Sequence, residues 1–172
     1  MLTVAQVVTA EQVKKTQTLF AEYFEFLRTD VDTDVDDLDE VVPMAGFREE
    51  MAGLPGKYAP PDGRLLLAEL DGQAAGCVAF YKLDEATCEV KRLWARPQFR
   101  RMKVGRALME TLVAEARSAG FATILLSSAD VLKEAHGLYY SLGFQPTEPF
   151  FEMPPEMLAN ELFMRLDLAT RP

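Results

Sequence analysis

The stretch from residue 64 to residue 95 constrains the fold most, because it has the character of three consecutive strands joined by short turns. Arg64–Leu70 is an apolar run, and Gln73–Leu83 and Thr87–Ala95 follow it. The dipeptide Asp71-Gly72 between the first two is typical of a tight β-hairpin, and Asp84-Glu85 marks the next turn. This stretch therefore predicts neighbouring strands of one sheet at the centre of the chain.

Helical and strand patterns alternate on both sides of this centre. Apolar residues recur at helical spacing over two long segments, and glycines follow the later helices where a left-handed residue would end them. The expected helices are Glu11–Arg28, Ala45–Leu54, Val104–Ala119 and a segment from a capping Asp130 to about Leu142; the expected outer strands are Thr3–Thr9, Phe121–Ser127, a strand from Phe144 onward, and Asn160–Leu168. The order β-α-α-β-β-β-α-β-α-β-β predicts a single α/β domain with a mixed sheet.

Composition excludes several classes of function. The chain has 172 residues, with 18 basic and 27 acidic side chains and a formal charge of -9. A general nucleic-acid binder needs a basic surface, so we expect no nucleic-acid partner. No apolar run approaches the roughly 20 residues that span a bilayer, and the first residues lack the pattern of a secretory signal. We therefore expect no membrane partner and a cytoplasmic location.

The cysteines and the histidine limit the chemistry further. Cys77 and Cys88 cannot form a disulfide framework, and with His136 they lack the spacing of a metal site. We expect no metal. The two cysteines fall on strands of one hairpin, which predicts reduced, buried thiols that lie near each other. His136 precedes Tyr139 by three residues and could share its helix face, although a buried structural histidine is the simpler interpretation.

A cluster of cations lies where a strand passes into a helix. Arg100, Arg101, Lys103 and Arg106 fall within seven residues of an otherwise acidic protein. The first turn of a helix leaves unpaired N–H groups and a partial positive charge, and Gly105 lets a ligand approach the backbone closely. These features predict a phosphate site of neither the GxxxxGK[ST] nor the GxGxxG type. The alternative is a solvated basic helix start.

Two longer motifs carry a family resemblance. The run EVKRLWARPQFRRMKVGRALM, followed by AHGLYYSLGF, resembles the GCN5-related N-acetyltransferases over about Arg64 to Leu168. The segment LPGKYAPPDGRLLLAELDG resembles one bacterial subset of that family. The resemblance implies a mixed, mostly antiparallel central sheet flanked by helices. It also implies one N-acetyltransferase domain over residues 1–172, with acceptor-side helices and loop in 1–60 and an acetyl-CoA-binding core in 64–168.

The resemblance implies acetyl-CoA as the donor and indicates which residues would bind it. The family signature is Q/R-x-x-G-x-G/A; Arg100 fills its first place, Gly105 its last, and Lys103 replaces the usual middle glycine. Ser128 aligns with a residue that helps to hold the pantetheine arm in relatives. By similarity, the pyrophosphate would bind to the N–H groups of Arg101, Met102, Lys103, Val104, Gly105 and Arg106, and the pantetheine would pair with the backbone of Leu93, Trp94 and Ala95. The two central parallel strands would splay at a bulge in this region.

Two side chains are the catalytic candidates. Glu89 would be the base, directly or through a water, since family members often carry Glu there and burial can raise a carboxyl pKa. Tyr139, from the YxxxGF motif, would be the acid for the departing thiolate, with Tyr140 as its neighbouring competitor. The alternatives are a salt bridge from Glu89 to Lys91 or Arg92 and a core aromatic role for Tyr139. Period-two counting puts Lys91 and Leu93 on the face of Glu89, and Trp94 on the opposite face, packed in the core.

The acceptor side carries a run of carboxylates. Asp30, Asp32, Asp34, Asp36, Asp37, Asp39 and Glu40 fall within eleven residues. Such a rim would attract a cationic amine, although a solvated acidic loop is the alternative. Phe47, Tyr58, Phe150 and Phe151 could wall the acceptor pocket or belong to the core.

These patterns together predict an acetyl-CoA-dependent N-acetyltransferase. The acetyl group would pass by direct attack to a primary amine of a small, cationic or zwitterionic acceptor. The alternatives are an inactive CoA or acyl-CoA-binding module, which the replacement at Lys103 favours, and an acyltransferase with another donor. A homodimer is among the oligomeric states left open.

Overall fold

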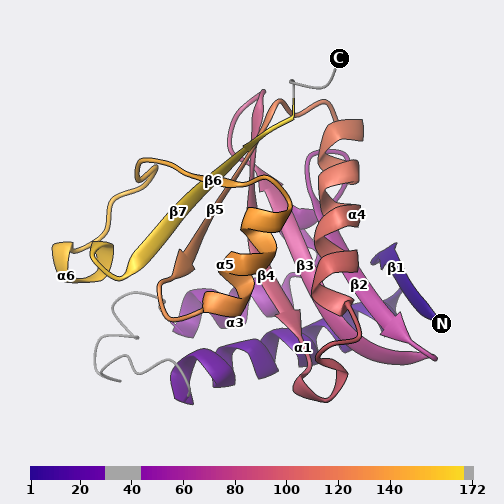
Figure 1. Ribbon diagram of the computed structural model, residues 1–172. Coiled ribbons are helices and arrows are strands. Elements are labelled where there is room, and N and C mark those ends of the chain that lie inside the picture. Colours follow the sequence, from indigo (N-terminus) through magenta and orange to yellow (C-terminus); the bar gives the residue numbers. More distant parts are fainter. Residues whose placement is uncertain (30–43, 169–172) are drawn as a thin grey trace.

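A seven-stranded sheet organises the protein (Figure 1). The computed structural model describes residues 1–29 and 44–168. The strand order is β1-β2-β3-β4-β5-β7-β6, and every neighbouring pair is antiparallel except β4 and β5. The strands are β1 (Leu2–Gln6), β2 (Arg64–Leu70), β3 (Gln73–Lys82), β4 (Thr87–Ala95), β5 (Thr123–Ala129), β6 (Gln145–Pro146) and β7 (Glu161–Asp167). The expected α/β fold with a mixed, mostly antiparallel sheet is confirmed.

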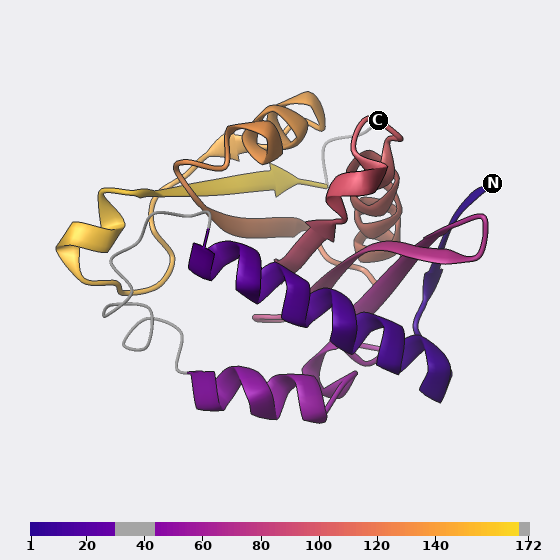
Figure 2. The ribbon, with the colours of Figure 1, turned by 90° about the horizontal axis from the view of Figure 1, so that it is seen from below.

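Helices cover both faces of this sheet. Figure 2 shows α1 (Ala10–Thr29) and α3 (Met44–Ala52) on one side, and α4 (Val104–Ser118) and α5 (Lys133–Ser141) on the other. Two short 3-10 turns, η1 (Gly56–Tyr58) and η2 (Pro97–Phe99), lie before β2 and before α4. A four-residue helix that the sequence did not predict, α6 (Pro155–Leu158), lies between β6 and β7.

Local sequence signals set most of these boundaries. Thr9 Oγ1 accepts the N–H of Gln12, and Gln12 Oε1 accepts the N–H of Thr9, so a reciprocal capping box begins α1. Asp71 and Gly72 have φ of 51° and 83°, which is the left-handed pair that a tight hairpin between β2 and β3 requires. Gly143 follows α5 with φ of 96°, as expected for the residue after a helix.

The expected cap of α5 is wrong. Leu132, not Asp130, is the residue before the first helical turn, and no side chain caps that end. The carboxylate of Asp130 instead accepts a hydrogen bond from Lys133 Nζ at 2.8 Å. Asp130 lies two residues before the N-cap position, so its carboxylate is not placed to cap the first turn.

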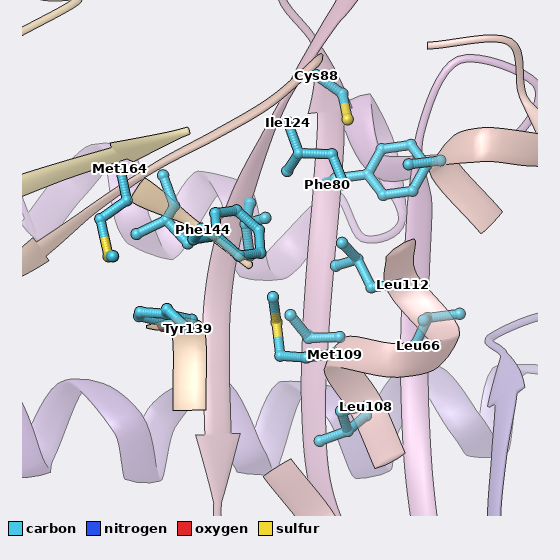
Figure 3. Close-up of a cluster of buried hydrophobic side chains, with 14 of the residues drawn as sticks. Leu66, Phe80, Cys88, Leu108, Met109, Leu112, Ile124, Tyr139, Phe144 and Met164 are labelled. Atoms are coloured by element: carbon cyan, nitrogen blue, oxygen red, sulfur yellow. The ribbon is translucent and has the colours of Figure 1, made fainter. Parts of the chain in front are cut away.

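Two hydrophobic clusters hold the layers together. The first lies between the sheet and the α4/α5 layer, where Leu108, Leu112 and Met109 are fully buried (Figure 3). The second lies on the opposite face, where α1 and α3 bring Phe20, Phe24 and Phe47 onto the sheet. Since apolar burial stabilises by about 25 cal/mol per Å², these two clusters supply the main driving force for the sandwich.

A β-bulge in β4 changes which side chains face which layer. Ala79 pairs with Lys91 and Cys77 pairs with Trp94, so β4 has one extra residue opposite β3. Arg92 has a left-handed φ of 64° at this point. As is typical of a bulge, two consecutive side chains, Lys91 and Arg92, now point toward the α1/α3 layer.

Two expectations based on strict alternation are therefore wrong. Trp94 packs in the α1/α3 cluster, on the same side as Glu89, while Leu93 packs in the α4/α5 cluster. Trp94 is nevertheless buried, as expected. Cys77 and Cys88 are free and buried, but they belong to different clusters on opposite faces of the sheet.

The two central parallel strands separate soon after they pair. The ladder between β4 and β5 joins Thr87–Glu89 to Thr123–Leu125 only. Beyond Glu89 the two strands diverge, as Figure 1 shows. The β5-facing backbone of the last part of β4 is therefore left without a partner strand.

Candidate active site

A cavity of about 510 Å³ lies at the start of α4, and we call it the α4 cavity. It is lined by Ala95, Phe99, Arg100, Arg101, Lys103, Val104, Gly105, Arg106 and Glu134. Most of the predicted cofactor-binding residues therefore come together in one place. Leu93, Trp94, Met102 and Ser128 lie outside this lining, while Phe99 and Glu134 belong to it without having been predicted.

The first turn of α4, which borders this cavity, has backbone amides that are not used within the helix. The first helical bond runs from the N–H of Ala107 to the carbonyl of Lys103, at 2.9 Å. Within the described residues, the N–H groups of Val104, Gly105 and Arg106 donate to no acceptor, and Lys103 supplies no side-chain cap. The amide of Met102 differs, because it donates to Phe99 at 3.2 Å. The free amides and the helix dipole favour an anion.

The backbone before α4 adopts the conformation that glycine usually supplies. Arg101 and Lys103 have φ of 66° and 61°. A non-glycine residue in this left-handed region costs roughly 1–2 kcal/mol. Lys103 thus reproduces the backbone geometry of the glycine it replaces, with strain, and adds a positive charge.

Gly105 is not required by the packing of the protein itself. A Cβ built on it would meet only Leu138 Cδ2, at an ordinary contact distance of 3.5 Å. Its lack of a side chain instead keeps the amides of the first turn accessible from the cavity. This accessibility fits a phosphate group better than it fits an internal packing role.

The cations around the cavity differ in whether they already bind other side chains of the protein. Arg106 donates to Ser141 Oγ at 2.8 Å and pairs with Glu110 at 3.3 Å. Arg100, Arg101 and Lys103 are exposed and make no ion pair with any described residue. Their charges are available for a diphosphate, so the residues present fit the group that the family resemblance implies.

The candidate base Glu89 is buried beside the bulge. The hydroxyl of Tyr81, its register partner on β3, donates a hydrogen bond to Glu89 Oε2. Lys91 Nζ lies 2.9 Å from Glu89 Oε1, but this oxygen accepts no hydrogen bond of good geometry from the described residues. The salt bridge that was the alternative interpretation of Glu89 therefore exists, with Lys91, yet one carboxylate oxygen keeps acceptor capacity.

The candidate acid Tyr139 is buried on α5, whereas Tyr140 is 47% exposed. The ring of Tyr139 packs at 5.9 Å from that of Phe144 (Figure 3). Burial raises the pKa of Tyr139, and the nearby Tyr23 hydroxyl adds to this effect. The Tyr139 hydroxyl makes no hydrogen bond to any described residue, so a protonated phenol is available as a donor.

Ser128 and His136 form a buried pair. His136 Nε2 lies 3.1 Å from Ser128 Oγ. Burial lowers the pKa of His136, so the imidazole is neutral near pH 7. This contact gives His136 a structural role. The Ser128 hydroxyl, which the family resemblance assigned to pantetheine binding, is thus already in contact with a side chain of the protein.

Ion pairs join β4 and the residue that follows it to α1 and α3, and the sequence did not single these pairs out. Arg92 donates to Glu50 of α3 at 2.9 Å, and Arg96 donates to Glu22 of α1 at 2.7 Å. Burial alone would raise the pKa of Glu50, but the hydrogen bonds and charge of Arg92 outweigh it and lower that pKa. Neither partner could be found from spacing, because each pair joins residues more than forty positions apart.

Tyr81, the partner of Glu89, could have been found from the sequence by counting back from the turn of the hairpin that joins their two strands.

Of the four aromatic residues proposed to wall the acceptor pocket, two lie in the core and two line a second cavity. Phe47 and Tyr58 are buried in the α1/α3 cluster. Phe150 and Phe151 line a second cavity of about 590 Å³, the α6 cavity, together with Pro149, Glu152, Met153 and Leu158. The acidic run Asp30–Glu40 lies outside the described residues, so its proposed role as a rim stays a prediction.

Two further searches concern metals and membranes. Within residues 1–29 and 44–168, no group of three or more His, Cys, Asp and Glu side chains could hold a metal ion. None of the helices in the described part of the chain is both long and apolar enough to cross a bilayer.

Comparison with known proteins identifies the family. Residues 18–144 match the model of the acetyltransferase (GNAT) family, which is most of the chain, so this protein belongs to that family. An uncharacterised N-acetyltransferase of Schizosaccharomyces pombe is 36% identical over 123 residues, covering 70% of this chain and 74% of the relative.

Solved structures show the same fold. An N-acetyltransferase of Thermoplasma acidophilum in complex with coenzyme A has a TM-score of 0.74 at 12% identity, covering 97% of this chain and 99% of the other. A protein of Salmonella typhimurium, solved with its cofactor acetyl-CoA, has a TM-score of 0.64 at 18% identity, covering 100% and 96%.

Proposed function

We propose that this protein transfers the acetyl group of acetyl-CoA to the primary amine of a small cationic or zwitterionic acceptor by direct attack. The α4 cavity carries this proposal, because it combines helix amides and three cations that have no partner among the residues the structure describes. Membership of the acetyltransferase family and the coenzyme A bound in a structural relative support the same donor. The bound donor would supply the activated thioester.

The chain's own residues would then perform three tasks. Glu89 accepts the proton that the ammonium must lose before attack, directly or through a water, and passes it to solvent. Backbone N–H groups of Leu93–Ala95 polarise the thioester carbonyl, since this part of β4 has no β5 partner. The amine nitrogen bonds to the carbonyl carbon, the C–S bond breaks, and Tyr139 donates its proton to the sulfur. One of the two protons left on the nitrogen then returns to the Tyr139 oxygen, and the other stays on the amide product.

Release of free thiol from acetyl-CoA in the presence of an amine panel tests the proposal. We expect thiol release that depends on the amine, with a matching mass increase of the acetylated product. A protein that binds coenzyme A but releases no thiol with any amine would be a binding module instead. A longer acyl-CoA used in place of acetyl-CoA, in the same assay, tests the choice of donor.

Glu89→Gln tests the base. The amide keeps the shape of the side chain and can still accept the hydrogen bond from Tyr81, but it cannot take a proton. We expect the acidic limb of the pH–rate profile to flatten, with activity reduced by roughly 10²–10⁴-fold at neutral pH. Glu85→Gln, in the exposed turn before β4, is the matched control. An unchanged acidic limb would show that the base is elsewhere.

A further inference from the structure

The α6 cavity lies directly beside the candidate base. Phe150 and Phe151 of its lining contact each other and the buried Phe163 edge to face, with ring centroids 5.2–5.4 Å apart, so Phe163 supports both rings from behind. The ring of Phe151 lies 5.8 Å from Lys91 Nζ, and Lys91 Nζ lies 2.9 Å from Glu89 Oε1. The cavity and the base are therefore connected through a single lysine.

The lining of the α6 cavity selects an apolar group. Phe151 is 38% exposed and Leu158 is 36% exposed, although both are large hydrophobic residues. Phe150 and Met153 add further apolar surface, and Glu152 is the one charged residue among the described residues of the lining. Because that charge is negative, an acidic substituent would be repelled, whereas an aromatic or branched aliphatic group would bury apolar surface.

The ion pair at Glu89 points to a substrate with both charges. Glu89 Oε2 is committed to Tyr81, while the buried Oε1 accepts no hydrogen bond among the described residues. A cation that approached Oε1 alone would meet the positive charge of Lys91 at the same oxygen. A substrate that also carries a carboxylate would engage Lys91 and leave Oε1 to its own ammonium. One ion pair would thereby be exchanged for two, of which the one at the buried Glu89 is shielded from water.

Lys91 is able to make this exchange. Its side chain is 27% exposed and sits on the bulged part of β4, so the ammonium is partly open to solvent and to a ligand. An amine without a carboxylate would have to break the pair of Lys91 and Glu89 without replacing it. The arrangement thus discriminates against simple amines as well as against acidic side chains.

We propose that the acceptor is an α-amino acid with an aromatic or branched aliphatic side chain. Its carboxylate pairs with Lys91, its amine faces Glu89, and its side chain enters the α6 cavity beside Phe151. This inference rests on the proposed N-acetyltransferase function and specifies the zwitterionic class of acceptor.

Three acceptors that differ by one group each test the inference in the thiol-release assay. L-phenylalanine carries all three features, phenethylamine lacks the carboxylate, and L-alanine lacks the ring. We expect kcat/KM for phenylalanine to exceed that for phenethylamine by at least about 10-fold, since a charge pair is lost. We expect it to exceed that for alanine by roughly 10–200-fold, since an apolar pocket is left empty. Equal or reversed preference in either comparison overturns the inference.

Variants then assign each preference to its residue. Lys91→Met keeps the aliphatic stem, and we expect the ratio of kcat/KM for phenylalanine over phenethylamine to fall to within about threefold of unity. Lys82→Met, which changes a lysine of similar exposure on β3, should keep the wild-type ratio.

Phe151→Ala should reduce the preference for phenylalanine over alanine, while Leu83→Ala, at an exposed turn, should not. A Lys91→Met protein that keeps the carboxylate preference would contradict the assignment, and melting curves show whether each variant is folded.

The outcomes separate this inference from the function on which it rests. If no amine releases thiol, the N-acetyltransferase proposal fails. If spermidine or phenethylamine is acetylated faster than every amino acid, the enzyme stands and only the acceptor class is wrong.

Discussion

Lys103 is the residue at which this chain departs from the signature of its family. Its left-handed backbone at φ of 61° shows that the fold accepts the geometry of a glycine without the glycine. The side chain is exposed, forms no ion pair with residues 1–29 or 44–168, and belongs to the α4 cavity lining. The backbone strain at Lys103 should therefore lower the stability of the fold, whereas its charge should favour binding of the phosphate groups.

Two substitutions at Lys103 separate these effects. Lys103→Gly should raise the free energy of unfolding by about 0.5–1 kcal/mol, because glycine adopts positive φ without steric cost. Lys103→Ala keeps the strain and should leave stability nearly unchanged. Both remove the charge and should weaken coenzyme A binding by a similar factor. Urea titration measures stability and calorimetry measures binding; tighter binding by either variant would contradict a role of the lysine in holding phosphate.

Tyr139 offers a sharper test, because its hydroxyl makes no hydrogen bond to a described residue. Tyr139→Phe should therefore change the free energy of unfolding by less than about 1 kcal/mol. It should lower kcat by roughly 10–1,000-fold and leave acetyl-CoA affinity largely intact. Tyr140→Phe, on the exposed side of α5, is the matched control. An unchanged kcat would leave Tyr139 with a packing role.

At the scale of elements, β4 determines how much of the site the sequence could predict. The strand itself, from Thr87 to Ala95, follows from its composition and from the proline that comes after it. The faces of Leu93 and Trp94 could not be predicted, because the bulge at Arg92 depends on pairing with β3 and on the ion pair of Arg92 with α3. Alternation is a local rule, and a bulge is a property of two strands. Cys77 and Cys88 lie on opposite faces for a simpler reason: Cys88 pairs with Lys82, and Cys77 is five residues from Lys82 along β3, which is an odd number of positions.

Gly76 shows how closely β3 approaches this part of β4. A Cβ at Gly76 would lie 2.5 Å from the Trp94 carbonyl oxygen and 3.0 Å from Val104 Cγ1. Gly76→Ala should therefore lower the free energy of unfolding by about 1–3 kcal/mol and displace the strand proposed to pair with pantetheine. Chemical denaturation measures the loss. Gly137→Ala is the control, because nothing lies within 4 Å of that Cβ in α5 and alanine should stabilise the helix by about 0.5–1 kcal/mol. Equal effects of the two substitutions would contradict this account.

At the scale of the whole molecule, the fold class follows from the sequence, and most residues of the proposed phosphate site line one cavity, while the connections between layers could not be predicted. The order of elements and the cation cluster are readable because they are local. The contacts of Glu22, Glu50 and Tyr81 join distant segments, and they appear only when the sheet and helices are packed. The predicted acidic rim falls outside the described residues.

Donor binding should stabilise the entire domain. Coenzyme A at 100 times its dissociation constant should add about 2.7 kcal/mol to the free energy of unfolding, which raises Tm by roughly 5–10 °C for a chain of this size. The shift should shrink at high salt, because the cations of the α4 cavity would be screened. The double variant Arg101→Ala and Lys103→Ala should lose most of it, whereas Arg117→Ala, at the far end of α4, should retain it. A Tm that does not respond to coenzyme A would argue against the site.

The two arginines that flank the proposed pantetheine strand have a consequence for engineering. Arg92 pairs with Glu50 of α3 and Arg96 pairs with Glu22 of α1, so two ion pairs hold this strand against both helices. Residues 1–60 therefore should not behave as an interchangeable cassette. In a chimera that carries these residues on another member of the family, the two helices should pack in the right place only if the recipient strand has both arginines. A recipient without the arginines should give a folded protein whose helices are displaced from the catalytic residues.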